Sequence, residues 1–269
     1  MKKHCVVLLV CFISLSCLLS CGLEAFYYID YIPNSVMDTT VRATINLPSS
    51  SSEGYSNYFT HFIIFYRIYI STIQETALIA STTTNNVLNT SLNSSLNSDF
   101  NSLYNSTDKT STNPSTANLE NTFLNRKFFQ LELESYNITS ILGSGSLGKT
   151  LEIAFPPNSG MRPTLILNGN SYVLQRVKGD DVLGIPPFYQ KPNDRYFLNY
   201  PELNDTANAT STINADVAAA NSNANADTDV RYTYVSMYIA ATGKSFELPP
   251  RNIYSQPTFI GVFRLAESS

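Results

Sequence analysis

The sequence predicts an all-β sandwich that carries two low-complexity insertions. Three observations support this. Several short segments alternate between apolar and polar residues, which is typical of half-buried strands. Residues that favour strands are abundant, including 17 Tyr and 15 Phe. No long segment has the apolar spacing of an amphipathic helix. We expect about eight or nine strands, separated by turns and paired into two packed sheets.

The first two predicted strands lie close to the N-terminus. Ala25–Ile32 is short and aromatic, and Pro33 ends it because proline cannot donate a ladder hydrogen bond. Val41–Leu47 alternates strictly, with Ala43 and Ile45 on one face and polar residues on the other. That period of two predicts a strand with one buried face.

The strongest strand pattern is Tyr58–Ser71. One face carries Phe62, Ile64, Tyr66, Ile68 and Ile70, and the other carries His61, Ile63, Phe65, Arg67 and Tyr69. Both faces are largely apolar, which is typical of a strand covered on each side. A buried helix is the alternative, but β-branched and aromatic residues dominate here. We therefore expect Tyr58–Ser71 to be a central strand.

Further strands are predicted by the same alternation and by turn residues. They are Phe129–Leu133, Leu151–Phe155, Thr164–Leu167, Ser171–Val177, Arg231–Ala240 and Thr258–Leu265. Asn168-Gly169 predicts a tight hairpin turn between two of them. Thr242-Gly243 predicts another turn.

Two segments are rich in Asn, Ser, Thr, Ala and Asp and poor in apolar residues, namely Ser81–Asn121 and Asn204–Asp229. A four-residue repeat runs from Leu88 to Thr107 in the first, and its apolar stripe could form a drifting helix. Asn, Ser and Thr disfavour helix interiors, so we favour disordered insertions in one domain that spans residues 21–269.

The N-terminus has the pattern of an export signal. Two lysines precede an apolar run of 14 residues, Val6–Leu19, which is shorter than the ~20 residues of a membrane-spanning helix. Leu18-Leu19-Ser20-Cys21, followed by Gly22, resembles the lipobox of bacterial lipoproteins. The resemblance implies cleavage before Cys21 and addition of fatty acyl chains such as palmitate. It also implies attachment to the cell membrane or outer membrane.

Cleavage there would leave a mature chain of 249 residues, which is 269 minus 20. All four cysteines lie at or before Cys21, so the mature body could hold neither a disulfide framework nor a cysteine-ligated metal. Cys17 is the alternative acceptor, but Ser14 stands where the lipobox has Leu. Cleavage also removes Lys2 and Lys3, so the mature chain would carry 15 basic and 21 acidic side chains, a net charge of −6. That charge disfavours nucleic-acid binding.

One motif for enzymatic chemistry is formally complete. Gly143-Ser144-Gly145-Ser146-Leu147-Gly148-Lys149-Thr150 fits the P-loop pattern, in which backbone amides cradle phosphates, Lys149 reaches them and Thr150 holds Mg²⁺. A P-loop needs a helix directly after it. Leu151–Phe155 instead alternates like a strand and is followed by a double proline. We therefore expect a connection between strands.

His61 is the one histidine of the mature chain, and we expect it to be structural. We expect no catalytic residue, no metal site and no cofactor. Beyond the lipobox, Tyr234, Ala240 and Gly243 resemble the penultimate strand of fibronectin type III domains, which implies an Ig-like or fibronectin-like sandwich.

With this N-terminal pattern, which covers about the first 22 residues, the chain resembles bacterial lipoproteins of the kind found in spirochaetes. The first functional hypothesis is a non-catalytic, lipid-anchored envelope protein with a structural or interaction role and a protein or glycan partner. The second is a ligand-binding lipoprotein, for example for glycans, that uses the tyrosines near Tyr189–Tyr200. The third is a nucleotide-binding enzyme that uses Gly143–Thr150.

Overall fold

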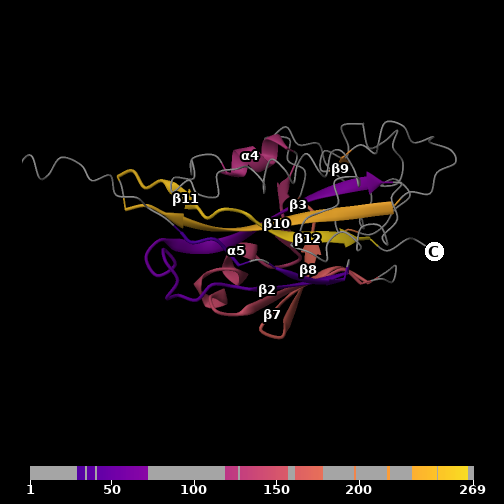
Figure 1. The fold of residues 1–269 in the computed structure, drawn as a ribbon, viewed down its shortest axis with the longest axis horizontal. Coiled ribbons are helices and arrows are strands. Elements are labelled where there is room, and N and C mark those ends of the chain that lie inside the picture. Colours follow the sequence, from indigo (N-terminus) through magenta and orange to yellow (C-terminus); the bar gives the residue numbers. More distant parts are fainter. Residues whose placement is uncertain are drawn as a thin grey trace, which may run out of the picture.

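The computed structural model of the chain consists of two β-sheets packed face to face (Figure 1). It describes residues 29–33, 35–39, 41–71, 119–126, 128–156, 161–177, 197, 217–218, 232–246 and 248–265. Strands account for about half of these residues, and the pairs are antiparallel except for β3 with β9. The predicted all-β sandwich is confirmed.

The first sheet has the order β1-β2-β6-β7-β8-β5. Its strands are β1 (Val36–Thr39), β2 (Arg42–Asn46), β5 (Glu132–Leu133), β6 (Thr150–Ala154), β7 (Thr164–Leu167) and β8 (Asn170–Gln175). The predicted alternation is confirmed in β2, where Ala43 and Ile45 are fully buried between exposed or half-buried neighbours. The β7–β8 hairpin turns at Asn168 and Gly169, with φ of 53° and 79°. Positive φ at both positions is what an Asn-Gly hairpin turn requires.

The second sheet has the order β11-β10-β3-β4, with β12 also paired to β10 and β9 to β3. Its strands are β3 (Phe59–Ser71), β4 (Phe129–Gln130), β9 (Val217–Ala218), β10 (Tyr232–Lys244), β11 (Asn252–Tyr254) and β12 (Thr258–Arg264). β3 lies between β10 on one side and β4 and β9 on the other. The prediction of a central strand at Tyr58–Ser71 is therefore confirmed.

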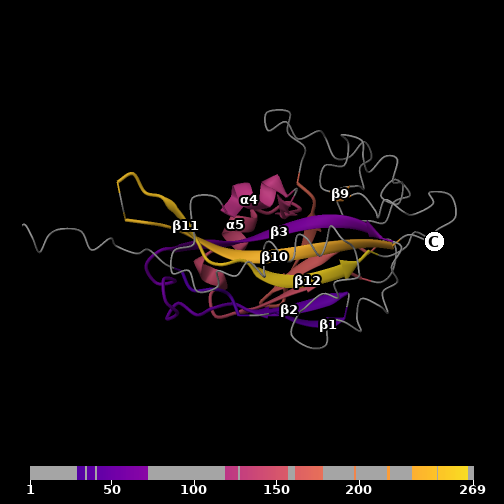
Figure 2. The same ribbon diagram turned by 45° about the horizontal axis from the view of Figure 1, so that its top comes forward.

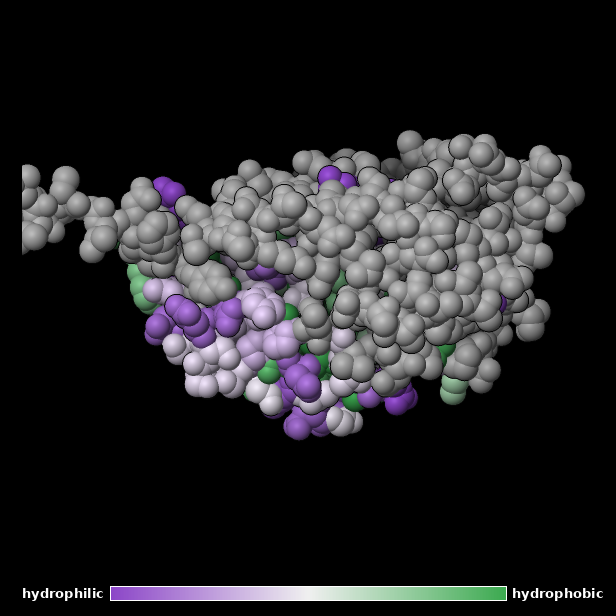
Figure 3. All heavy atoms as spheres, in the orientation of Figure 1, coloured by the Kyte–Doolittle hydropathy of each residue, from purple (hydrophilic) through white to green (hydrophobic). Residues whose placement is uncertain are grey.

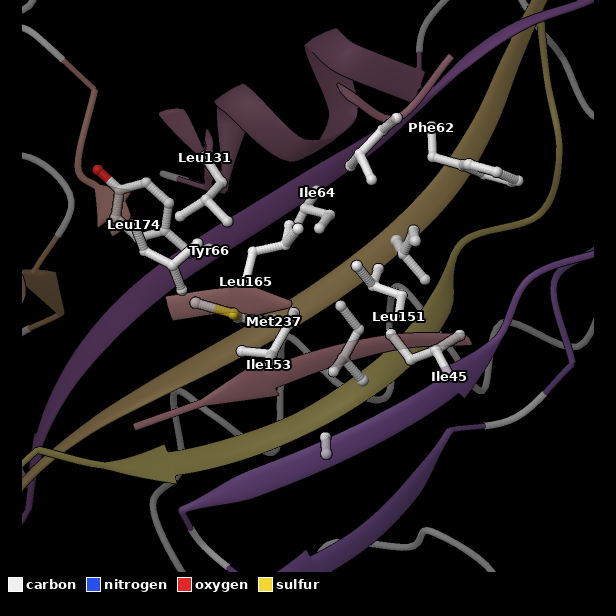
Figure 4. Close-up of a cluster of buried hydrophobic side chains, with 14 of the residues drawn as sticks. Ile45, Phe62, Ile64, Tyr66, Leu131, Leu151, Ile153, Leu165, Leu174 and Met237 are labelled. Atoms are coloured by element: carbon white, nitrogen blue, oxygen red, sulfur yellow. The ribbon is translucent and has the colours of Figure 1, made fainter. Parts of the chain in front are cut away.

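The two faces of β3 enter two separate apolar clusters. Phe62, Ile64 and Ile68 belong to the core between the sheets. Figure 4 shows Ile64 and Met237 of the second sheet directed toward side chains of the first sheet such as Ile153. On the opposite face, residues of β3 lie in an outer cluster, covered by the short helix α4 (Leu119–Asn125) (Figure 2).

Aromatic rings hold α4 against the outer face of the sheet. The Phe123 ring stacks on Phe65 at 4.2 Å and meets Phe128 and Tyr238 edge-on at 5.5 and 5.6 Å. Phe123 is fully buried. A helix of seven residues is too short to be stable alone, so this packing accounts for it.

The segment after α4 joins the two sheets. Phe129 and Gln130 pair with β3, whereas Glu132 and Leu133 pair with β8 of the first sheet. At the crossing point, the Leu131 amide donates to the Ile64 carbonyl over 2.7 Å. The alternation predicted for Phe129–Leu133 is correct, since all three apolar side chains are buried. The single strand expected there is two short ones.

Two local predictions are wrong. Residues 29–32 form no strand, and the rest of Ala25–Ile32 lies outside the described residues. Ile29 and Ile32 are instead fully buried and belong to the core between the sheets. The Thr242-Gly243 turn is also absent, because β10 continues through Gly243 to Lys244. Its partner β3 extends equally far, and Lys244 donates to the Tyr58 carbonyl over 3.0 Å.

Most of the two predicted insertions lies outside the described residues. Within the described part, Leu119–Asn121 begins α4, so ordered structure starts before the predicted end of the first insertion. Val217–Ala218 forms β9, which runs parallel to β3 inside the range given to the second. α4 and α5 (Ile138–Ile141) are short helices that the sequence pattern did not predict.

Candidate functional site

The Gly143–Thr150 loop is the first candidate site, and its backbone donors decide what it can bind. Four successive amides donate to carbonyl oxygens of the protein: Ser146 to Gly143 (2.9 Å), Leu147 to Ser144 (3.3 Å), Gly148 to Pro48 (2.8 Å) and Lys149 to Ser146 (3.2 Å). A P-loop uses amides of this kind to cradle phosphates. These four could do so only by giving up their present partners.

The elements around the loop also differ from those of a P-loop. Helix α5 precedes it, one turn of 3-10 helix, η2 (Ser144–Ser146), lies within it, and strand β6 follows from Thr150. A phosphate site of this class needs a helix N-terminus after the loop. The Thr150 hydroxyl donates to the Asn46 side chain over 3.1 Å. The Leu47 amide donates to the Lys149 carbonyl over 2.9 Å, so the loop fastens β6 to the end of β2.

His61 lies in a row of polar side chains across the second sheet. In the strand register, Thr242 of β10 stands opposite His61 of β3 on one side and opposite Tyr254 of β11 on the other. His61 Nδ1 lies 3.1 Å from the Thr60 hydroxyl and 3.3 Å from the Thr242 hydroxyl. The two hydroxyls are 2.8 Å apart, so the three groups form one hydrogen-bonded cluster.

Glu120 of α4 is hydrogen-bonded to the last residue of this row, Tyr254. The Tyr254 hydroxyl donates to Glu120 Oε1 over 2.8 Å. Burial and the hydrogen bond to Glu120 raise the pKa of Tyr254 to about 12. Tyr254 is therefore protonated at neutral pH and acts as a donor that fixes α4 to the sheet.

The electrostatics of His61 follow mainly from its partial burial. Desolvation lowers the pKa of His61 below 6.5, and the Glu120 carboxylate opposes that shift. A neutral imidazole could accept a proton from a hydroxyl, as in a Ser-His-Asp triad. In the described part of the chain, however, the hydrogen bond of Glu120 goes to Tyr254, and the hydroxyls beside His61 bond to each other. The arrangement fits a structural histidine.

Sequence reasoning singled out His61 but not Glu120 or Tyr254. Those two residues are 134 positions apart, and Glu120 stands inside the range predicted to be an insertion. No local pattern links them. The pairing depends on α4 packing over the sheet.

The other predicted sites are placed as follows. Cys21 lies outside the described residues. So does the Tyr189–Tyr200 cluster, apart from Phe197. Phe197 is 2% exposed and packs edge-on against Tyr66 and Phe155 at 4.9 and 5.9 Å. That ring belongs to the core and offers no stacking surface.

The described residues contain no group of three or more His, Cys, Asp or Glu side chains that could hold a metal ion. None of their helices has the length and apolar character needed to cross a membrane. Comparison of the chain with protein-family models, with curated proteins and with solved structures finds no match.

Proposed function

We propose that the protein is an exported lipoprotein, held at the envelope by acyl chains on Cys21, with a non-catalytic structural or interaction role. The observation that carries this proposal is the Leu18-Leu19-Ser20-Cys21 pattern directly after a basic start and a short apolar run. A single acyl chain gives marginal membrane binding, whereas two or more give a lasting hold. The β-sandwich would then be displayed from the membrane surface.

The described loop and cluster support the non-catalytic part of the proposal. The amides of Ser146–Lys149, which would have to cradle a phosphate, are engaged in backbone hydrogen bonds. His61 is held by two threonine hydroxyls. A domain of this kind would contact a protein or glycan partner through its loops or through edge strands such as β1 and β5.

Labelling with radioactive palmitate in cells tests the anchor, with matched cysteine variants. Wild type and Cys17→Ser should both take up label, because neither loses the proposed acceptor. Cys21→Ser should take up none. Persistent labelling of Cys21→Ser, or loss of label in Cys17→Ser, would show that the lipobox assignment is wrong.

A further inference from the structure

The β10–β11 hairpin ends in an exposed apolar tip. Leu248 is 95% exposed and Phe246 is 69% exposed, and both are among the large apolar side chains that the described surface leaves in solvent. Pro249 and Pro250 follow them and are exposed as well. In Figure 1 the hairpin reaches beyond the other coloured elements at its end of the molecule. Figure 3 shows a green, apolar area at that same left edge of the described surface, otherwise mainly purple and white there.

Hydrogen bonds close the base of the hairpin. The Ser245 amide donates to the Arg251 carbonyl over 2.9 Å, and the Arg251 amide donates back to the Ser245 hydroxyl over 2.9 Å. The Phe246 ring packs against Tyr58 at 5.2 Å. These hydrogen bonds close the hairpin below its tip, where the Leu248 side chain gains nothing from facing water.

The hairpin lies at the end of the molecule where the N-terminal segment arrives. The Ile29 side chain packs directly over Gly243, near the last residue of β10. Cys21 precedes Ile29 by eight residues, which can span at most about 28 Å. An anchor at Cys21 would thus hold this end of the sandwich close to the bilayer.

The tip segment, residues 244–251, is more basic than the chain as a whole. Lys244 and Arg251 are exposed on the two sides of the tip. Glu247 is the one acidic residue between them in the sequence, so the segment has a net charge of +1 against −6 for the mature chain. Basic residues beside apolar ones are the composition that favours the interface between head groups and acyl chains.

We infer that the tip formed by Phe246 and Leu248 inserts into the head-group region of the bilayer that carries the Cys21 anchor. This inference rests on the proposed lipid anchor. The hairpin gives the sandwich a second membrane contact and fixes its orientation, so that the opposite ends of the strands, such as the Arg42 end of β2, face outward.

The absence of cysteine after Cys21 makes a clean test available. Leu248→Cys places the one reactive thiol of the acylated, mature protein at the tip, where an environment-sensitive fluorophore can be attached. Met161→Cys is the matched control, because Met161 is also an exposed apolar residue, at 60%. Met161 lies at the opposite end of the sandwich from the tip. It precedes Thr164 of β7, which pairs with Ala154, and Ala154 pairs with Arg42. Arg42 is at the end of β2 remote from residues 47–58, which lead to Tyr58 beside the tip. Phe246→Cys provides a second tip position.

Each labelled lipoprotein is reconstituted on vesicles of phosphatidylethanolamine and phosphatidylglycerol that contain a bilayer-embedded quencher, and flotation is measured in parallel. We expect all variants to float, with blue-shifted and strongly quenched emission at position 248 or 246 and neither effect at 161. Flotation without quenching at the tip would overturn the inference and leave the anchor intact. Equal quenching at 161 would indicate adsorption of the whole domain and would also overturn it. Failure of every variant to float would refute the anchor, and this inference with it.

Discussion

Truncation of Ile64 to alanine tests the architecture at its centre. Ile64 is 1% exposed, lies in the core between the sheets and stands opposite Ile239 in the β3–β10 register. Its carbonyl also receives the Leu131 amide where the chain crosses between the sheets. The residue is therefore held between β10 and the crossing segment at Leu131, and its side chain lies inside the packed core.

The expected loss of stability follows from the atoms removed. Ile→Ala deletes three carbon groups, which at about 0.8 kcal/mol each corresponds to about 2.4 kcal/mol of lost burial. A cavity that does not collapse adds to this, so the free energy of unfolding should fall by ~2–5 kcal/mol. Ile68→Ala should behave alike, since Ile68 is fully buried on the same face of β3.

Urea denaturation of the mature chain with Cys21→Ser measures this loss, and Leu248→Ala is the matched control. It deletes the same number of carbons from a side chain that is 95% exposed, and should change the free energy of unfolding by less than about 0.5 kcal/mol. If Ile64→Ala cost no more than Leu248→Ala, β3 would not be the central strand of the core.

Three further predictions concern the sheet end, the Gly-Ser loop and the histidine. Gly243→Ala should destabilise by at least about 2 kcal/mol, because a Cβ would lie 2.3 Å from the Tyr58 carbonyl oxygen; Gly145→Ala, with nothing within 4 Å, should cost less than about 0.5 kcal/mol in the same denaturation assay. In thermal melts, ATP with Mg²⁺ should leave the Tm of wild type and Lys149→Ala unchanged, and a rise in wild type that Lys149→Ala removes would restore the P-loop. Because the pKa of His61 is lowered on folding, the unfolded state binds more protons below pH 6.5, so stability should fall on acidification through that value. His61→Gln should weaken this pH dependence, measured by urea midpoints, and an identical dependence would exclude His61 as its source.

The parts of the fold that the sequence predicts are those fixed by local chemistry. The period-two pattern around Ala43 and Ile45 places the buried face of β2 correctly, because the pleat alone sends alternate side chains to opposite faces. Asn168-Gly169 predicts its hairpin because both residues tolerate positive φ. The alternation in Leu151–Phe155 predicts a strand, and therefore no helix, after Lys149, and β6 confirms it.

The parts that sequence reasoning missed depend on distant partners. β10 continues through Gly243 because β3 offers backbone groups up to Phe59, and glycine allows the close approach to Tyr58 that a side chain would block. Phe123 holds α4 by packing against rings of β3 and β10 that its own segment does not encode. The candidate site likewise has one part that the sequence indicates and one part that only the packed fold creates. His61 is visible as a single residue, whereas its relation to Glu120 exists only after α4 has packed on the sheet.

Mass spectrometry of the mature N-terminus tests the central claim most directly. The account predicts a chain that begins at Cys21, with a diacylglycerol on its sulfur and an acyl group on its amine. An unmodified Cys21, in a cleaved or an uncleaved chain, would contradict the proposal that this β-sandwich is a lipid-anchored protein of the envelope.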